Sequence, residues 1–208
     1  MTAILDYGVG NLFSLSSSLA RIGEQAVVTA DPAVLCAADR IILPGVGAFA
    51  DAAEKLRASG LAEPLKAEVR KGKPLLGICL GMQLLFEKSY EYGEHAGLGL
   101  LRGAIRPISE QVQGLKIPHM GWNALTFVGE RHPLFSYISE GDCVYFVHSY
   151  CAVDCGDALL ATAEYGAPIT AAVGRGNVMG CQFHPEKSGE TGLAILRAFC
   201  EMKEGAVC

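Results

Sequence analysis

The N-terminal half of the chain alternates short runs of consecutive apolar residues with longer stretches in which apolar residues recur every three or four positions. Runs of roughly four to eight apolar residues are typical of buried strands, and the three-to-four spacing is typical of amphipathic helices. The predicted strands are AILDY (3–7), QAVVT (25–29), RIILP (40–44) and PLLGIC (74–79), and the predicted helices are 11–23, with Asn11 as N-cap and Gly23 as terminator, 49–60, 61–72 and 82–90. Apolar strands separated by helices indicate a parallel sheet with helices on both faces.

The C-terminal half has a different pattern. Strand-like segments joined by short glycine-containing turns predict antiparallel hairpins that join the sheet. These segments are 99–108, 143–151, 158–166, 169–176 and 177–183, and residues 189–202 predict a closing amphipathic helix. Because no repeat, linker or low-complexity tract interrupts the pattern, we expect one α/β domain over residues 1–208, with a mixed, mostly parallel central sheet flanked by helices.

One stretch, KIPHMGWN at 116–123, fits neither pattern. It has neither the period of a helix nor the alternation of a half-buried strand, so we predict that it is neither. It also holds the only tryptophan of the chain, Trp122, close to a histidine and a methionine. A lone tryptophan can fill a core, whereas tryptophan and methionine together are typical of the centre of a protein interface.

Composition narrows the class of protein. Of 208 residues, 50% are hydrophobic and 19% charged, and the mean hydropathy is +0.29, which favours a compact domain with a sizeable core. A net charge of −5 without a cluster of Lys and Arg argues against nucleic acid as a partner. No apolar segment reaches the roughly 18 residues that span a membrane, and no secretion signal is visible, so we expect a cytoplasmic protein without a membrane partner.

Eight cysteines are distributed singly along the chain. This share is below that of disulfide scaffolds and indicates reduced thiols. The nearest pair, Cys151 and Cys155, lacks the second pair of ligands that a zinc site needs. We therefore expect no metal, and we also expect no cofactor.

LLGICLGMQ (75–83) predicts a reactive cysteine. A strand runs into Cys79, glycines lie two residues before and two after it, and a helix follows at once, which is the nucleophile-elbow pattern with sulfur in place of a serine oxygen. The helix N-terminus favours the reactive thiolate, and the Leu80 N–H is a candidate oxyanion donor. Alternatively, Cys79 is a core thiol at an ordinary strand end, which is our interpretation of the other seven cysteines.

His184 is the candidate base. It lies in GCQFHPEKS at the end of an apolar strand, and Pro185 favours extended backbone before it. In an extended chain residues 184 and 186 point to the same side, about 6.5 Å apart, so Glu186 can orient the imidazole and complete a Cys-His-Glu triad. Zinc deaminases carry H-x-E as well, but the P-C-x-x-C that accompanies it is missing downstream.

Two further segments are candidates for substrate contacts. IILPGVGAF (41–49) reads as strand, glycine-rich turn and helix without a phosphate-binding motif, so we interpret the Val46 or Gly47 N–H as a second oxyanion donor. Gln83 lies four residues after Cys79 on the same helix face, where it can bind a substrate head group or simply be exposed.

PGVGAF, GICLGMQLLF and QFHPEKS occur in the order of the oxyanion loop, nucleophile elbow and His-x-Glu segment of class I (triad-type) glutamine amidotransferases, and the chain resembles that family, whose fold is flavodoxin-like. Further stretches extend the resemblance over nearly the whole chain and are similar to the glutaminase subunits of imidazole glycerol phosphate synthase. They are ILDYGVGNL, GLGLLRG, KIPHMGWN, YFVHSY, ATAEYG and HPEKS. Cys151 departs from the pattern, because a larger polar or aromatic residue is expected after HSY, and it puts a thiol near the site.

The resemblance implies that Cys79 attacks the side-chain amide of L-glutamine, that His184 carries the proton to the leaving ammonia, and that water hydrolyses the glutamyl thioester. It implies glutamine-binding roles for Gly47, Gln83, Glu91, His148, Ser149 and Tyr150. The ammonia is expected to pass to a (β/α)8 cyclase subunit that forms a heterodimer with this chain, activates it and makes imidazole glycerol phosphate and aminoimidazole carboxamide ribotide in histidine biosynthesis. The implied partner interface comprises Pro118, His119, Met120, Gly121, Trp122, Asn123 and Lys187.

Three other functions stay open from the residues. The same chemistry can serve another synthase, such as those of anthranilate, aminodeoxychorismate, GMP or pyridoxal phosphate, although KIPHMGWN argues against them. The chain can be a cysteine hydrolase on a related scaffold. It can also be a catalytically silent scaffold, which the complete triad disfavours.

Overall fold

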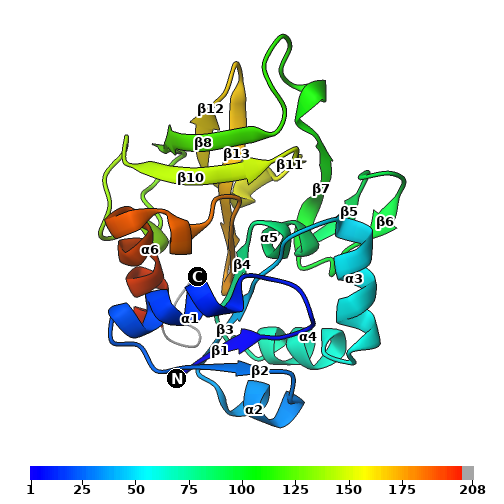
Figure 1. Cartoon of the computed structure of the whole chain (residues 1–208), viewed down its shortest axis with the longest axis vertical. Coiled ribbons are helices and arrows are strands. Elements are labelled where there is room, and N and C mark those ends of the chain that lie inside the picture. The colour runs from blue at the N-terminus through cyan, green and yellow to red at the C-terminus, as the bar shows by residue number, and fades with distance from the viewer. Residues whose placement is uncertain (203–208) are drawn as a thin grey trace.

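A computed structural model describes residues 1–202, in which helices cover a central sheet and two smaller sheets lie beside it (Figure 1). The strands of the central sheet lie in the order β2 (Ala26–Thr29), β1 (Thr2–Leu5), β3 (Arg40–Leu43), β4 (Leu75–Ile78), β14 (Val178–Cys181), β13 (Pro168–Arg175), β12 (Leu159–Glu164) and β9 (Thr126–Phe127). The pairs from β2 to β14 are parallel and the pairs from β14 to β9 are antiparallel. The sheet is therefore mixed, with its parallel part on the N-terminal side, as predicted.

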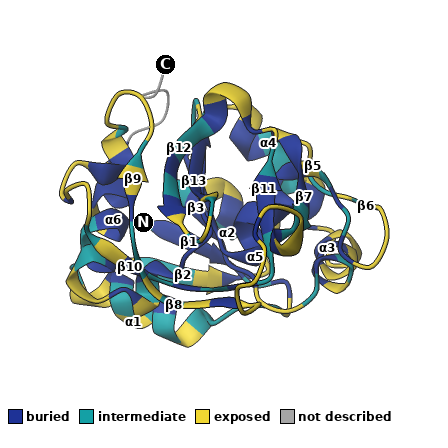
Figure 2. Ribbon diagram, turned by 90° about the horizontal axis from the view of Figure 1, so that it is seen from above, coloured by how far each residue is buried: buried dark blue, intermediate teal, exposed yellow. Residues whose placement is uncertain are grey.

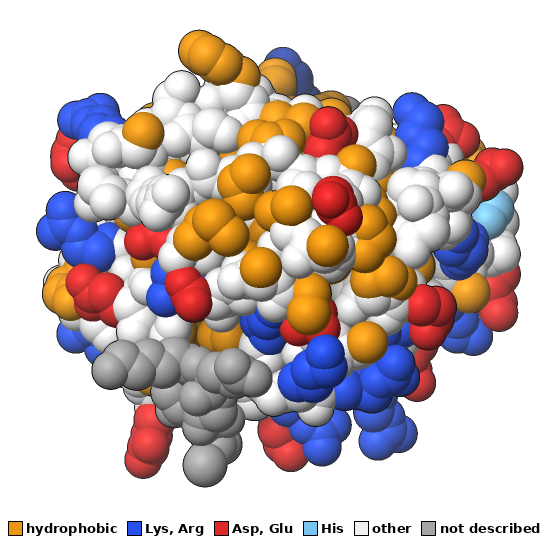
Figure 3. Space-filling model, turned by 90° about the horizontal axis from the view of Figure 1, so that it is seen from below, with side chains coloured by type: hydrophobic (Ala, Val, Ile, Leu, Met, Phe, Trp, Pro, Cys, Tyr) orange, Lys and Arg blue, Asp and Glu red, His pale blue; other side chains and the backbone are white. Residues whose placement is uncertain are grey.

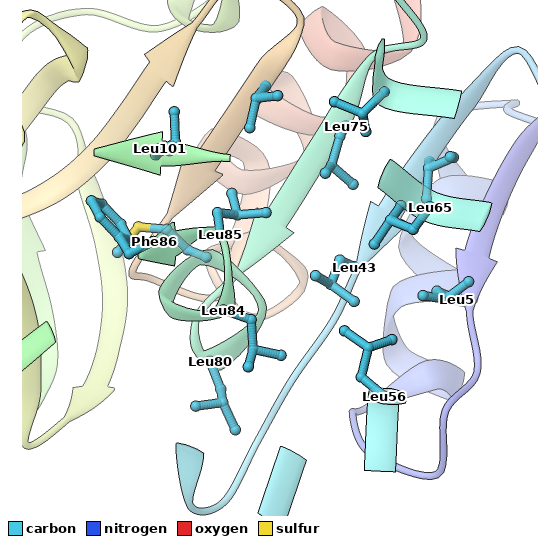
Figure 4. Close-up of a cluster of buried hydrophobic side chains, with 14 of the residues drawn as sticks. Leu5, Leu43, Leu56, Leu65, Leu75, Leu80, Leu84, Leu85, Phe86 and Leu101 are labelled. Atoms are coloured by element: carbon cyan, nitrogen blue, oxygen red, sulfur yellow. The ribbon is translucent and has the colours of Figure 1, made fainter. Parts of the chain in front are cut away.

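The inner parallel strands β1, β3, β4 and β14 are buried on both faces, which is why their sequences are largely apolar. Leu5, Leu43 and Leu75 belong to one hydrophobic cluster, which Figure 4 shows, whereas Ile4 and Ile42 belong to a second cluster on the other face. Fully burying each of these side chains stabilises the fold by roughly 1.5–3 kcal/mol. In Figure 2 the central strands are correspondingly buried and the exposed residues lie mostly in loops and on the outer sides of helices.

Within residues 1–202, six helices cover the sheet and begin largely where the sequence predicts. They are α1 (Leu12–Arg21), α2 (Pro32–Ala37), α3 (Phe49–Ala58), α4 (Ala62–Arg70), α5 (Leu80–Leu84) and α6 (Gly189–Glu201). The Asn11 side chain accepts a hydrogen bond from the Ser14 N–H, which confirms the predicted N-cap of α1. Helix α2 was not predicted, although Asp31 caps it and Pro32 stands at its first position, both of which are helix-start signals.

Two smaller sheets lie beyond the central one. A four-stranded sheet has the order β11 (Tyr150–Val153), β7 (Leu101–Pro107), β5 (Phe86–Ser89) and β6 (His95–Ala96). A two-stranded antiparallel sheet consists of β8 (His119–Ala124) and β10 (Cys143–His148), and we call it the ribbon. Short 3₁₀ turns, η1 (Ile108–Glu110), η2 (Pro133–Phe135), η3 (Gly156–Ala158) and η4 (Pro185–Lys187), connect these parts.

Three sequence predictions about local structure are wrong. Residues 82–90 do not form one helix, because α5 ends at Leu84 and Phe86–Ser89 pairs with β7 instead. The segment 143–151 is not one strand, because the chain leaves β10 at Ser149 and enters a different sheet at Tyr150. The segments that form β7, β10 and β11 were predicted to join the central sheet, but they belong to the two smaller sheets. In each case pairing with a distant strand decides the structure against the local pattern.

KIPHMGWN also differs from its prediction, because its last five residues belong to strand β8. The ladder to β10 pairs Trp122 with Tyr145 and His119 with His148. The pattern does not look like that of a half-buried strand because polar side chains lie on the inner face and apolar ones on the outer face.

The end of the molecule at the bottom of Figure 1 is formed by the region around α2 and β2. In the view of that end, apolar side chains gather in the middle and charged side chains lie around them (Figure 3). Val28, on the edge strand β2, is 39% exposed. Within residues 1–202, none of the helices combines the length and the apolar character that a membrane span requires.

Candidate active site

Three parallel strands bring their carboxyl ends to the same edge of the sheet, and the candidate catalytic residues lie there. Cys79 follows β4, the Pro44–Gly47 loop follows β3, and His184 lies three residues beyond β14. Ligands of open α/β sheets bind at this edge. The order of the strands, β3-β4-β14, puts the cysteine between the loop and the histidine.

Cys79 occupies a strained turn between β4 and α5. Its φ of 54° and ψ of −110° are unusual for a residue with a side chain, and such strain costs on the order of 1–3 kcal/mol. Its N–H donates to the Cys181 carbonyl on β14 at 2.7 Å, which fixes the turn to the sheet. A Cβ on Gly81 would lie 1.9 Å from the Leu43 carbonyl oxygen, so only glycine allows the helix to begin this close to β3. These features are those of a nucleophile elbow.

His184 and Glu186 form a buried pair beside the cysteine. The Nδ1 of His184 lies 2.8 Å from Oε1 of Glu186, and the imidazole also interacts with the Cys79 side chain. The backbone does not follow the extended path that we predicted beyond residue 184, because Pro185–Lys187 is a 3₁₀ turn. The turn nevertheless brings the carboxylate back to the imidazole.

The environment of His184 favours its charged form. Burial lowers its pKa, but the hydrogen bonds with Cys79 and Glu186 and the negative charges of both groups outweigh burial and raise the pKa from 6.5 to about 9. The second carboxylate oxygen of Glu186, Oε2, is buried and has no hydrogen-bond partner among the residues that the structure describes. No hydrogen-bond donor at Oε2 therefore weakens the attraction between the Glu186 carboxylate and the imidazole.

Ser188 holds the backbone of His184 and was missed in the sequence. Its hydroxyl donates to the His184 carbonyl at 2.6 Å and accepts from the Tyr145 N–H at 3.0 Å. The His184 N–H in turn donates to the Tyr145 carbonyl at 2.9 Å. Because Tyr145 belongs to β10, these three bonds attach the histidine directly to the ribbon.

Gln83 is buried rather than exposed, and it acts together with Gln182, which the sequence reading did not single out. The Nε2 of Gln83 donates to the Tyr150 carbonyl at 3.2 Å and to Oε1 of Gln182 at 3.0 Å. The Nε2 of Gln182 then lies 3.6 Å from Sγ of Cys79, to which it donates. A signal existed, because Gln182 and His184 lie two residues apart and face the same side of an extended segment.

The Pro44–Gly47 loop forms another side of the site. The Tyr7 hydroxyl donates to the Pro44 carbonyl at 2.7 Å, which fixes the start of the loop. Val46 and Gly47 are exposed, and Gly47 has a positive φ of 94°. Glu91 accepts a hydrogen bond from the Phe49 N–H at 2.5 Å and so closes the loop at the start of α3. This bond gives Glu91 a structural role in addition to the predicted contact with substrate.

These residues surround a cleft of about 630 Å³. All predicted oxyanion and glutamine-binding residues line it, together with two of the three triad residues and two interface residues. They are Val46, Gly47, Cys79, Leu80, Gln83, Glu91, Pro118, His148, Ser149, Tyr150, His184 and Lys187. Glu186 lies behind His184. The cleft is large enough for a small polar substrate beside the sulfur.

The ribbon carries apolar side chains on its outer face, beside the cleft. Met120 is 65% exposed and Trp122 57% exposed, so the tryptophan does not fill a core. Trp122 makes an edge-to-face contact with Tyr145, with ring centroids 6.1 Å apart, and the Lys187 ammonium lies 6.0 Å from the centre of the Tyr145 ring. His119 differs from the other predicted interface residues, because its side chain is buried in the ribbon's inner face.

The seven cysteines that the structure describes are free thiols. Cys151 does not reach the cleft, because its side chain packs against Ile108, Val112 and Ile169. Burial raises its pKa to about 12, and Gln111 donates to its sulfur at 3.1 Å. A thiol with so high a pKa is not nucleophilic at neutral pH. Cys208 lies outside the described residues.

Known proteins resemble the chain over nearly its whole length. The sequence profile of the family described as "Glutamine amidotransferase class-I" matches residues 3–202. The imidazole glycerol phosphate synthase subunit HisH of Bacillus velezensis is 53% identical over 207 residues, which cover 97% of this chain and 96% of that protein. The same subunit of Syntrophotalea carbinolica is 47% identical over 207 residues, 97% of this chain and 100% of that protein.

Solved structures show the same fold at lower identity. A crystal structure of a glutamine amidotransferase superposes with a TM-score of 0.75 at 21% identity, covering 96% of this chain and 97% of that one. The structure of PurLQS from Thermotoga maritima superposes with a TM-score of 0.71 at 22% identity, covering 95% and 96% of the two chains.

Proposed function

The chain belongs to the class I glutamine amidotransferases and, within them, to the HisH subunits of imidazole glycerol phosphate synthase, and from this membership we propose that it hydrolyses L-glutamine and supplies the ammonia for imidazole glycerol phosphate formation in histidine biosynthesis. The observation that carries the proposal is the buried Cys79, His184 and Glu186 arrangement at the base of the cleft. Each of the three groups has the neighbour that acyl transfer requires.

The proposed reaction begins when Cys79 Sγ attacks the carboxamide carbon of glutamine. His184 holds the proton that the thiol gives up, and it donates that proton to the leaving nitrogen so that ammonia departs. The raised pKa of His184 suits this acid step, because the ring is protonated at neutral pH. Water then attacks the glutamyl thioester, with His184 accepting its proton, and glutamate is released. Glu186 orients the ring and stabilises its positive charge.

The negative charge of the tetrahedral intermediate needs donors at the base of the cleft. We propose the Leu80 N–H at the start of α5 and a second N–H from Val46 or Gly47. The amino-acid head group of glutamine would lie against Gln83, Glu91 and the backbone of 148–150. Both N–H groups of the Gln83 amide are engaged within the protein, which leaves its Oε1 to accept from the substrate ammonium.

The acceptor of the ammonia is proposed to be a (β/α)8 cyclase subunit in a heterodimer with this chain. Two features support such a partner. The Met120 and Trp122 side chains form an exposed apolar surface on the ribbon, and such side chains are enriched at the centres of interfaces. The chain also lacks a phosphate-binding motif of its own for a phosphorylated acceptor.

The experiment is to replace Cys79→Ala in the assembled heterodimer and to measure synthesis of imidazole glycerol phosphate with glutamine or with ammonium as the nitrogen source. We expect loss of the glutamine-dependent reaction and retention of the ammonium-dependent one. Cys36→Ala is the matched control, because Cys36 is an exposed cysteine in α2 that does not line the cleft, and it should change neither reaction. Loss of both reactions in Cys79→Ala would contradict the division of labour. Peptide hydrolysis without glutamine turnover would favour a cysteine hydrolase instead.

A further inference from the structure

The inner face of the ribbon contains two histidines in direct contact. His119 and His148 are 3% and 6% exposed, and Nδ1 of His119 lies 3.0 Å from Nε2 of His148. The His119 ring is stacked between Phe146 and Tyr165, with ring centroids 4.7 and 4.2 Å away. Neither ring can turn without breaking this packing, so the contact is a fixed part of the fold.

The hydrogen-bond partners of the two rings determine where the protons lie. His148 Nδ1 is 2.8 Å from the Tyr150 carbonyl, which can only accept, so Nδ1 carries the hydrogen. In a neutral His148 ring Nε2 is then an acceptor, and the hydrogen of the contact belongs to His119 Nδ1. The remaining nitrogen of His119 accepts from Nδ2 of Asn123 at 3.2 Å. The second hydrogen of that amide goes to the Glu164 carbonyl at 2.8 Å.

This arrangement uses every donor and acceptor of both rings. A buried polar network in which each member is satisfied rigidifies its surroundings, whereas a partly satisfied one is destabilising. Burial lowers the pKa of His119 and lowers the pKa of His148 to about 3, so both rings are neutral at pH 7, as the bonding pattern requires.

The Tyr150 carbonyl connects this network to the cleft. It accepts from His148 on one side and from Gln83 on the other. Gln83 donates onward to Gln182, which donates to the Cys79 sulfur. A hydrogen-bonded chain thus runs from Asn123 in the ribbon to the nucleophile, with the Tyr150 carbonyl as the point at which both halves meet.

We propose that His119 and His148 are positioning residues for the glutaminase reaction, a neutral imidazole pair with fixed tautomers that holds the Tyr150 carbonyl and, through it, the Gln83 amide in the geometry that binds glutamine. The proposal rests on the proposed glutaminase function. It also gives His119 a role different from the partner contact that the sequence suggested. Neither histidine takes a proton in the reaction.

Two substitutions of His119 separate positioning from simple packing in the assembled heterodimer. His119→Phe keeps a flat ring for the stack but removes both hydrogen bonds, and His119→Asn keeps a nitrogen donor near the position of Nδ1. We expect His119→Phe to raise the KM for glutamine roughly tenfold with a smaller change in kcat. The reason is that a displaced Gln83 would lose its hydrogen bond to the substrate, and one lost hydrogen bond has about that effect. His119→Asn should recover most of the loss. An unchanged KM in a folded His119→Phe variant, or equal KM values in the two variants, would overturn the proposal.

A second measurement decides the matter even if His119→Phe does not fold. In the wild-type chain, nitrogen NMR of the imidazoles should show both His119 and His148 as neutral Nδ1–H tautomers from pH 6 to 8. A Nε2–H tautomer at His148, or titration of either ring near its ordinary pKa of about 6.5, would refute the proposed pair. Failure of wild-type heterodimer to hydrolyse glutamine at all would instead refute the proposed function.

Discussion

The elbow around Cys79 and the ribbon of β8 and β10 form different walls of one cleft, but they are built in different ways. At the elbow, backbone packs directly on backbone, as the contact of Gly81 with the Leu43 carbonyl shows. The ribbon has only two strands, and its inner face depends on side chains from distant parts of the chain, such as Tyr165. An isolated pair of strands is marginally stable. Cys79 is therefore held by close backbone packing, whereas the ribbon is held mainly by side-chain contacts.

The two regions meet at His184. Its ring hydrogen-bonds to the elbow cysteine, whereas its backbone is attached to Tyr145 of the ribbon. A change in the ribbon can thus reach His184 without moving Cys79. This difference leads to four tests, in which elbow variants should affect folding and ribbon variants should affect binding or turnover.

The largest effect is expected from Gly81→Ala in the elbow. The new methyl group would meet the Leu43 carbonyl oxygen at 1.9 Å, and backbone atoms cannot move aside cheaply. We expect the free energy of unfolding to fall by about 3 kcal/mol or more. Urea denaturation measures it. The control is Gly129→Ala, where φ is 70° and no atom lies within 4 Å, so that only backbone strain of about 1 kcal/mol is added. Equal losses in the two variants would contradict the packed elbow.

The contact between the two regions predicts a pH dependence. The pKa of His184 in the folded protein is raised from 6.5 to about 9, so its stabilising contribution is complete below pH 6.5 and is lost as the pH rises to about 9. A pKa raised by this much corresponds to roughly 3 kcal/mol. The difference in unfolding free energy between wild type and His184→Asn should therefore shrink across pH 6.5–9. Glu186→Gln, which removes the charge, should lower the His184 pKa measured by NMR, and a pKa at or below 6.5 in the wild type would contradict this account.

Trp122→Ala tests the outer face of the ribbon. The side chain is 57% exposed, so its removal should leave the unfolding free energy nearly unchanged. Because Trp122 lies in the proposed interface, its loss should nevertheless weaken association with the proposed cyclase partner by about 2 kcal/mol, or roughly 30-fold in Kd. Tyr137→Ala removes another exposed aromatic ring, which bonds to Glu201 at the far end of α6, and should leave Kd unchanged. An unaltered Kd for Trp122→Ala would contradict the proposal that the outer face of the ribbon binds the partner.

The smallest effect is expected from Ser188→Ala, which removes the attachment of His184 to the ribbon. Two hydrogen bonds are lost, but the backbone bond from His184 to Tyr145 persists. We expect kcat/KM for glutamine to fall by about fivefold to tenfold, equivalent to about 1 kcal/mol. Ser17→Ala, on the exposed side of α1, should have no effect. A Ser188→Ala enzyme with wild-type kinetics would show that this attachment does not matter to catalysis.

The elbow was predictable from sequence because its constraints are local. Cys79 with its flanking glycines, and the strands and helices on either side, are encoded within a few residues, and the parallel half of the sheet follows from the same kind of pattern. His184 and Glu186 were predictable as a pair because they lie two residues apart, although the turn that joins them was not. The family resemblance supplied the candidate glutamine-binding residues, and the structure places them around one cleft.

The ribbon was not predictable because its structure depends on pairing across the chain. Trp122 faces Tyr145 only once β8 and β10 are aligned, and nothing near either residue specifies that register. The burial of His119 depends on Phe146 and Tyr165 in the same way. Gln182 and Ser188 escaped notice because a glutamine or serine is common everywhere, and only the folded structure shows that each contacts the reacting groups or their backbone.

The neutral state of His148 has a consequence for proton transfer in the proposed reaction. Three imidazoles lie at or near the cleft, but His148 and His119 have their hydrogens committed to fixed acceptors and pKa values lowered by burial. They can neither deliver a proton to the sulfur nor take one from water at neutral pH. Only His184, whose pKa is raised, exchanges protons in that range. A site with several histidines thus has a single proton carrier, and in the proposed reaction the leaving nitrogen receives its proton from the side of His184 only.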